Sequence, residues 1–396
     1  MNNIVMPNFE FKIKHQDDKC LARIGEIKTK HGKIETPVFL PVATNASVKS
    51  LTTRDMLELN AEILMANTYH LFLRPGLDVI ESHGGLHKFM NWSLPLMTDS
   101  GGFQAFSLGI GAKHGVGKIA GEAKQIKKIK HAKVNDDGVI FYSQYDGKKV
   151  FLTPELSIQI QQILGSDIML AFDECTSPLS NYNYNKKAML RTHKWAERCL
   201  KARETDQGLY GIIQGGIFKD LREQSAKFIC SLDFDGIAIG GSFGKNEMYT
   251  VLDWLSKIIT RDKPVHLLGI GTIEDFFNSI ERGIDSFDCV TPTRLARVGF
   301  AFIRPEDGGN VKNKFRIDIG RAEYKKDQRP ISEVCNCYTC KNYTRSYLRH
   351  LYNVKELAFY RLMSIHNLNF FLQLMKEIRK SIKNSSFIEM KNEWLK

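Results

Sequence analysis

The sequence lacks any long apolar run. No stretch of 18 consecutive apolar residues, the minimum for a candidate membrane-spanning helix, occurs among its 396 residues. The N-terminal stretch, MNNIVMPNFEFKIKH, also lacks the basic start, apolar centre and small-residue cleavage site of a secretory signal. We therefore expect a soluble protein of the cytoplasm with no membrane partner.

Cysteine is too sparse for a disulfide framework. The chain has eight cysteines in 396 residues, whereas small secreted domains pair an even set of closely spaced ones. Five of the eight stand singly in apolar surroundings, at Cys20, Cys175, Cys199, Cys230 and Cys289. The other three cluster between residues 335 and 340. We expect reduced thiols and one metal site.

Acidic residues are outnumbered by basic ones. The chain has 44 Asp and Glu against 56 Lys and Arg, a net charge of +12. This balance favours a polyanionic partner such as nucleic acid or an acidic membrane surface, although a merely basic soluble enzyme would share it. Hydrophobic residues make up 43% of the chain, which predicts a large packed domain, alone or with an appendage, rather than disorder.

Eight short apolar runs predict the fold. They cover residues 36–44, 62–68, 94–102, 166–174, 209–216, 235–241, 264–271 and 284–289. Helical patterns separate most of them, for example at 154–164, 185–203 and 272–283. Continuous apolar strands alternating with helices are typical of a parallel sheet buried on both faces. We predict a (β/α)8 TIM barrel, with an open doubly wound sheet as the alternative.

The strand ends are the places to look for function, because a barrel carries its active site at the carboxyl ends of its strands. The residues there are mostly carboxylates, amides and glycines: Thr44, Asn67, Asp99, Asp173, Gln214, Gly240, Gly241, Gly269 and Asp288. A single strand-end Asp is more often a turn or helix cap than a catalyst. Three on one rim indicate a site that recognises a small, flat, polar molecule.

One segment interrupts the alternation. Residues 109–134 are rich in Gly and Lys, including Lys127 and Lys128, and precede a hairpin-like stretch. We interpret them as a basic insertion, which is either a solvated loop or a set of phosphate contacts. We assign residues 1–320 to the barrel and residues 321–396 to a C-terminal subdomain packed on it.

A metal signal lies in that subdomain. Cys335, Cys337 and Cys340 form Cys-x-Cys-x-x-Cys, and His366 follows 26 positions after the last thiol. Three thiolates and one imidazole form the closed shell of a structural zinc site. Spacing alone leaves His350 as another candidate for the fourth ligand. An apolar stripe from Leu368 to Ile382 predicts a long amphipathic helix on the barrel or on a second subunit.

Several of these motifs together resemble the tRNA-guanine transglycosylases. They are MTDSGGFQAFSL (97–108), DIMLAFDECT (167–176), GIIQGG (211–216), AIGGS (238–242), HLLGIG (266–271), FDCVTPTR (287–294) and the Cys3His cluster. They occur in the family's order from about residue 10 to about residue 385. Members of this family are zinc-bearing TIM barrels, commonly homodimers, that exchange the wobble guanine of certain tRNAs for a 7-deazaguanine base.

The resemblance implies a role for each matching residue. Asp288 matches the family's nucleophile and Asp99 its proton-transfer aspartate. Residues expected at the base are Asp173, Gln214, Gly241, Asn67, Phe103, Cys175, Leu268 and Gly269. The zinc ligands match Cys335, Cys337, Cys340 and His366. Residues expected near the RNA are Arg294 and Arg297, with Lys127 and Lys128 of the insertion. Tyr343, Tyr347 and His350 match the aromatic cluster of the family's dimers.

The sequence also departs from the family pattern. Ala296 and Val298 replace a glycine and an asparagine after the nucleophile, and Phe103 replaces a common tyrosine. Gly244 stands where a valine is usual, in the loop that faces the substituent of the incoming base. We hypothesise that the pocket admits queuine as well as, or instead of, 7-aminomethyl-7-deazaguanine, although Cys175 favours the bacterial pattern. The alternative functions are a two-carboxylate TIM-barrel glycosidase and a non-catalytic tRNA-binding subunit.

Overall fold

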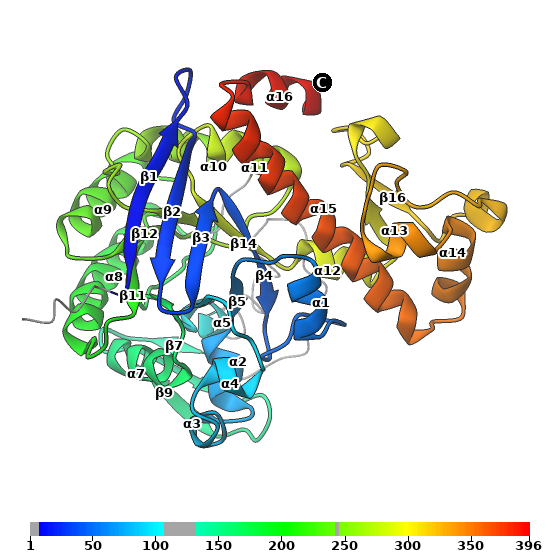
Figure 1. The fold of residues 1–396 in the computed structure, drawn as a ribbon. Coiled ribbons are helices and arrows are strands. Elements are labelled where there is room, and N and C mark those ends of the chain that lie inside the picture. The colour runs from blue at the N-terminus through cyan, green and yellow to red at the C-terminus, as the bar shows by residue number, and fades with distance from the viewer. Residues whose placement is uncertain (1–7, 107–131, 242–244) are drawn as a thin grey trace, which may run out of the picture.

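The computed structural model describes residues 8–106, 132–241 and 245–396 (Figure 1). At its centre is a closed barrel of eight parallel strands. In chain order these are β4 (Val38–Ala43), β5 (Leu64–Ala66), β6 (Leu96–Thr98), β10 (Ile168–Leu170), β11 (Gly208–Ile213), β12 (Gly236–Ile239), β13 (Val265–Leu267) and β14 (Ser286–Cys289). Seven of the eight predicted runs contain one strand each, β11 begins one residue before its run, 209–216, and β14 pairs with β4 to close the barrel. The TIM-barrel prediction is confirmed and the open sheet is excluded.

The apolar strands are buried on both faces. Val38 and Leu40 belong to the cluster that fills the barrel, together with Met65 and Ile212. Phe39 points the other way, into the larger cluster that includes the helices. Because successive side chains of a strand point to opposite faces, strands that are covered inside and outside need apolar residues at nearly every position.

Helices α7 (Pro154–Leu164), α8 (Tyr182–Ala202) and α11 (Ile273–Ile280) match the predicted patterns. The sequence sets the limits of α7. The Thr153 hydroxyl accepts a hydrogen bond from the Leu156 amide, Pro154 occupies the first turn, and Gly165 ends the helix in the left-handed conformation. The other helices before β14 in the described residues are α1 (Thr53–Glu58), α2 (Thr68–Leu73), α3 (Leu77–Ser82), α4 (Leu86–Phe89), α5 (Gly102–Phe106), α9 (Lys219–Ser231) and α10 (Lys245–Leu255).

An antiparallel sheet covers the amino-terminal end of the barrel. It comprises β1 (Glu10–Gln16), β2 (Arg23–Thr29) and β3 (Gly32–Thr36). Ile27 and Ile34 of this sheet join the apolar cluster inside the barrel. Arg23 and Asp285, both fully buried, form an ion pair of 2.7 Å that ties β2 to the start of β14. The sheet therefore closes the barrel opposite the strand ends that were predicted to carry function.

A second antiparallel sheet follows the predicted basic insertion. It comprises β7 (Lys133–Val134), β8 (Val139–Tyr142) and β9 (Lys149–Leu152), and β8 with β9 forms the predicted hairpin. Most of the insertion itself, residues 109–131, lies outside the described residues.

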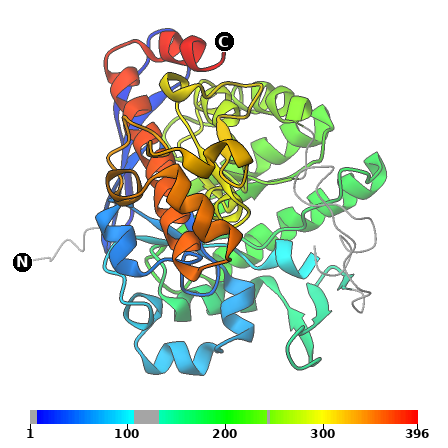
Figure 2. The same cartoon turned by 90° about the vertical axis from the view of Figure 1, so that its right-hand side faces the viewer.

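The C-terminal part leaves the barrel and returns to it. It comprises α12 (Thr291–Ala296), β15 (Phe300–Phe302), the 3-10 helix η2 (Pro305–Asp307), β16 (Arg316–Asp318), the 3-10 helix η3 (Ala322–Lys326), α13 (Tyr338–Asn342), α14 (Arg345–Asn353), α15 (Leu357–Lys383) and α16 (Phe387–Trp394). Helix α15 runs from this subdomain back along the barrel (Figures 1 and 2). Its Phe371 ring lies 5.1 Å from that of Phe39 in β4.

The predicted apolar stripe of α15 is therefore packed on the barrel. All five residues that define it are buried: Leu368, Phe371, Met375, Ile378 and Ile382. The domain boundary at residue 320 stays a prediction. Within the described part of the chain, no helix is both long enough and apolar enough to cross a membrane.

Candidate active site and metal centre

The three predicted carboxylates lie at the same end of the barrel. Asp99 directly follows β6, Asp173 lies just beyond β10, and Asp288 belongs to β14. Because the eight strands are parallel, their carboxyl ends meet at one rim. Asp173 is buried, whereas Asp99 and Asp288 are half-buried, so the latter two are shielded from water without being sealed from a substrate.

Asp288 is held by a backbone amide and an imidazole. The Gly269 N–H donates to Oδ1 of Asp288 over 2.7 Å, and Nε2 of His266 lies 3.2 Å from the same oxygen. Gly269 has a φ of 70°, a left-handed conformation that glycine adopts without steric cost. Two donors on one carboxylate oxygen stabilise the ionised form and fix its orientation.

Asp99 is fixed by the start of the neighbouring helix. Asn67 caps α2 by accepting a hydrogen bond from the His70 amide, and its Nδ2 donates to Oδ2 of Asp99 over 2.5 Å. The Thr68 amide donates to Oδ1 over 3.0 Å, and Gln104 donates to Oδ2 over 3.1 Å. Asn67, predicted at the base, therefore also orients Asp99.

Asp173 and Gln214 are brought together by adjacent strands. Nε2 of Gln214 donates to Oδ2 of Asp173 over 2.6 Å, and both side chains are buried. Space for the amide depends on Gly240 at the end of β12, because a Cβ atom there would lie 2.5 Å from Nε2 of Gln214. The rim thus holds a carboxylate acceptor and an amide side by side.

The other residues expected at the base differ in burial. Cys175 is buried, and Phe103, Leu268 and Gly241 are half-buried. Phe103 lies on α5, directly after the strand end that carries Asp99. Gly244, in the loop that departs from the family pattern, lies outside the described residues.

The predicted RNA-binding residues are described only in part. Arg294 is exposed on α12 and Arg297 is half-buried just after it. Burial lowers the pKa of the Arg297 guanidinium, and the positive charge of Arg294 lowers it further. Two guanidiniums that repel each other at the end of α12 form a local positive field. Lys127 and Lys128 lie outside the described residues.

The two departures after the nucleophile have different environments. Ala296 is fully buried in α12, and Val298 is 51% exposed. Ala296 therefore contributes to packing beneath the arginines, whereas Val298 presents an apolar side chain on the surface.

The sequence alone did not predict the residues that hold the carboxylates by hydrogen bonds, above all His266. Its ring is fully buried in β13, and in the sequence it is one polar letter inside the apolar run 264–271. A histidine in an apolar run indicates a buried polar role. The run alone, however, does not show that β13, which carries His266, pairs with β14, which carries Asp288.

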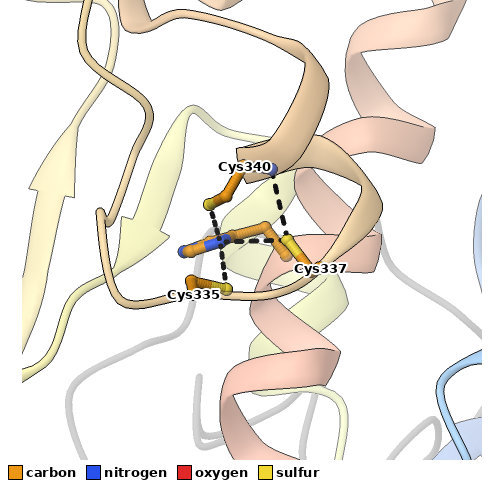
Figure 3. A group of neighbouring side chains, drawn as sticks. Cys335, Cys337 and Cys340 are labelled. Carbon is orange, nitrogen blue, oxygen red and sulfur yellow. Dashed lines mark hydrogen bonds between the residues drawn. The ribbon is translucent and has the colours of Figure 1, made fainter.

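Apart from the carboxylate rim, the structure brings together the four predicted metal ligands, Cys335, Cys337, Cys340 and His366, in a group that could hold a metal ion. The sulfur atoms of Cys335, Cys337 and Cys340 lie 3.8, 3.7 and 3.3 Å from Nδ1 of His366, and the cysteines point toward a common centre (Figure 3). A tetrahedral shell with zinc-like bond lengths has edges of roughly 3.6 Å. His350 is exposed on α14 and is not part of this group.

The imidazole of His366 is oriented for such a role. Its Nε2 donates to the Phe302 carbonyl over 2.7 Å, which directs Nδ1 toward the three sulfurs. Metal-bound histidines usually make this kind of outer hydrogen bond. Asn369 donates to Sγ of Cys335 over 3.4 Å, which helps a thiolate carry its charge.

His31, His87 and Asp167 form another group at the opposite end of the barrel. The two imidazole rings are stacked, with centroids 3.6 Å apart, so their in-plane lone pairs lie side by side instead of converging on one ion. Burial alone would raise the pKa of Asp167, but hydrogen bonds from His87, the Leu96 amide and His31 lower it overall. We interpret this group as a structural tie.

Comparison with known proteins places the chain. The sequence model of the family described as Queuine tRNA-ribosyltransferase matches residues 17–396. A protein of Archaeoglobus fulgidus, provisionally named a queuine tRNA-ribosyltransferase, is 51% identical over 401 residues, 98% of this chain and 99% of that protein. The queuine tRNA-ribosyltransferase of Caldanaerobacter subterraneus is 45% identical over 396 residues, 99% of this chain and 98% of its own.

A third relative, the queuine tRNA-ribosyltransferase of Bacillus subtilis, is 45% identical over 378 residues, 94% of this chain and 92% of its own. Matches of this extent confirm the resemblance that the strand-end motifs and the Cys3His cluster predicted. This chain therefore belongs to the queuine tRNA-ribosyltransferase family.

Proposed function

We propose that this protein exchanges the wobble guanine of specific tRNAs for a 7-deazaguanine base through a covalent aspartyl-ribose intermediate. The proposal rests on one observation above all. The Asp288 carboxylate is half-buried at the barrel rim, and its Oδ1 is held by the Gly269 amide and His266. A carboxylate held in this way is suited to attack an anomeric carbon.

In the first half-reaction, Asp288 attacks C1′ of the ribose. The C1′–N9 bond to guanine breaks, a C1′–O ester forms, and Asp99 supplies the proton that the departing guanine needs. In the second half-reaction, the incoming base attacks C1′ and gives its proton to Asp99, and the ester oxygen leaves as the carboxylate. Two inversions give net retention, which is required for a base exchanged within an intact RNA chain.

The incoming base is recognised by Asp173 and Gln214. Asp173 accepts hydrogen bonds from the ring N–H and exocyclic amine of a guanine-like edge, and the Gln214 amide and the Gly241 backbone serve its carbonyl. Such a pocket rejects bases that leave these groups unpaired. Phe103, Cys175, Leu268, Gly269 and Asn67 complete the walls of the pocket.

The tRNA is held by positive charge around the rim. Arg294 and Arg297 approach the phosphates next to the flipped nucleotide, and Lys127 and Lys128 make further phosphate contacts. Turning a base out of its stack costs least in a single-stranded anticodon loop.

The Cys3His group holds one structural zinc ion per chain. The donor set fits zinc because three sulfurs and one imidazole complete a tetrahedron and leave no position for substrate. The ion takes no part in the chemistry and stabilises the fold of residues 335–366.

We further propose a homodimer in the cytoplasm. Tyr338 and Tyr347 are 49% and 44% exposed on the subdomain, and the Tyr343 ring stacks on Tyr347 with centroids 5.4 Å apart. Exposed aromatic clusters are typical of protein interfaces.

Two 7-deazaguanines are candidates for the incoming base. We propose that the pocket takes 7-aminomethyl-7-deazaguanine or queuine, and incorporation of each into tRNA that carries labelled guanine distinguishes them. Release of label by either base supports the exchange reaction, and strong rejection of queuine removes that substrate. If neither base nor free guanine releases label, the proposed function is wrong.

A further inference from the structure

Ser286, His266 and Asp288 form a column of polar side chains inside the barrel. His266 of β13 pairs in register with Ser286 of β14, and Asp288 lies two residues further along β14 on the same face. The register neighbours on the flanking strands are apolar: Ala238 beside His266, Val38 beside Ser286 and Leu40 beside Asp288. His266 and Ser286 are both buried, so the column has little access to water.

Both ring nitrogens of His266 have partners in this column. Nδ1 lies 2.9 Å from Oγ of Ser286, and Nε2 lies 3.2 Å from Oδ1 of Asp288. An ionised carboxylate can only accept hydrogen bonds, so Nε2 must carry the hydrogen that faces Asp288. In a neutral ring Nδ1 then accepts from the Ser286 hydroxyl. The Asp288 carboxylate thereby selects the tautomer that donates to it, and the Ser286 hydroxyl satisfies Nδ1.

We infer that His266, held in place by Ser286, positions Asp288 and favours its departure from the ribose, which makes His266 a positioning residue for the reaction. The inference rests on the proposed function, because it assumes that Asp288 forms the ester.

The chemistry predicts which half-reaction depends on His266. Asp288 is an anion before it attacks C1′, loses its charge in the ester, and regains it when the incoming base displaces it. The Nε2–H of His266 stabilises the anion at both ends of this cycle and interacts less with the neutral ester. Without it, the equilibrium shifts toward the ester, and departure of the carboxylate, which restores the anion, becomes slower.

Two substitutions of the same residue separate this role from simple packing. A glutamine at position 266 can place an amide N–H near the position of Nε2 and so donate to Asp288. An asparagine is shorter and reaches only the position of Nδ1, beside Ser286. Ser286→Ala leaves the ring in place and removes the hydrogen-bond partner of Nδ1. His266→Asn is thus the test, His266→Gln the rescue and Ser286→Ala the milder variant.

The measurements are guanine-exchange kinetics and the fraction of enzyme trapped as a tRNA adduct on denaturing gels. For His266→Asn we expect kcat to fall by about 10- to 100-fold, the cost of a hydrogen bond to a charged group, while KM for tRNA does not rise, because accumulation of the ester lowers it. The trapped fraction should rise despite the slower turnover. His266→Gln should recover most of kcat, and Ser286→Ala should lose about 2- to 10-fold.

The opposite results would overturn the inference. It fails if His266→Asn and His266→Gln are equally active or equally impaired, or if the trapped fraction falls in step with kcat, as partial unfolding would cause. Asp288→Asn distinguishes this failure from failure of the proposed function. If Asp288→Asn still exchanges guanine, the nucleophile is wrong; if it is inactive and His266→Asn matches the native protein, only the role of His266 is wrong.

Discussion

Gln214 donates a hydrogen bond to Asp173 over 2.6 Å, and this contact joins the two side chains that we propose recognise the base. A guanine-like edge donates hydrogen bonds to Asp173 and presents a carbonyl to Gln214. The Asp173 carboxylate therefore accepts hydrogen bonds both from the base and from Gln214. Asp173→Asn should raise KM for free guanine by about 10- to 100-fold, because a neutral amide accepts less strongly and presents unwanted N–H donors.

The measurement is the dependence of exchange on guanine concentration. Ser100→Ala is the matched control, because Ser100 also contacts Asp173, but over a long 3.4 Å, and it should change KM by no more than about 3-fold. Equal KM values for Asp173→Asn and the native protein would show that the base is recognised elsewhere.

We expect the Cys3His cluster to bind a zinc ion that stabilises the folded protein. Cys337→Ala removes one ligand, so bound zinc should fall from about one equivalent to almost none, and the melting temperature should fall with it. Metal content by mass spectrometry and thermal unfolding test this. Cys230→Ala makes the same change in α9, away from the cluster, and should keep the metal. Undiminished zinc in Cys337→Ala would refute the ligand assignment.

Stability should fall as the pH drops below about 6.5 because of His193. Burial lowers the pKa of His193 from 6.5 to about 4; its Nε2 lies 3.2 Å from the Ser225 hydroxyl. Between these two pH values the unfolded chain binds a proton at His193 that the folded chain does not. The contribution of neutral His193 to the free energy of unfolding is therefore fully present above pH 6.5 and decreases toward pH 4.

His193→Gln cannot titrate and keeps a polar atom for Ser225, so its melting temperature should depend less on pH in this window. His83→Gln, at an exposed histidine, is the control and should behave like the native protein. The same pH dependence in His193→Gln as in the native protein would assign the acid sensitivity to other groups.

The fold was predictable where the signal is local along the chain. Each barrel strand is a continuous apolar run because both of its faces are buried, and α7 carries its own cap and stop at Thr153 and Gly165. The metal cysteines lie within six residues, 335–340. These features could be recognised without knowing which segments become neighbours.

The supporting residues of the site were not predictable in this way. The contact of His266 with Asp288 depends on the register of β13 and β14, and that of Asn67 with Asp99 depends on the pairing of β5 with β6. The tie between His31, His87 and Asp167 joins three distant segments. Register and tertiary pairing create these contacts, and no short sequence pattern contains them.

Binding of tRNA should weaken with salt through the rim arginines. Arg294→Ala should lower the slope of log Kd against log salt by about 0.7 to 0.9, the value for one phosphate contact. Lys201→Ala is the control, because Lys201 is exposed in the last turn of α8, away from the strand ends that carry the site. Lys127→Ala with Lys128→Ala tests the insertion in the same way. An unchanged slope in any of these rim or insertion variants would show that its residues do not touch phosphate.

The central claim is that the ribose of tRNA becomes esterified to Asp288. The most direct measurement is to denature the protein with its tRNA, digest both, and locate the modified peptide by mass spectrometry. We predict a nucleotide on the peptide that contains Asp288, its loss when free guanine is added before denaturation, and no adduct in Asp288→Asn. An adduct on Asp99, or none in a protein that still exchanges guanine, would contradict the claim.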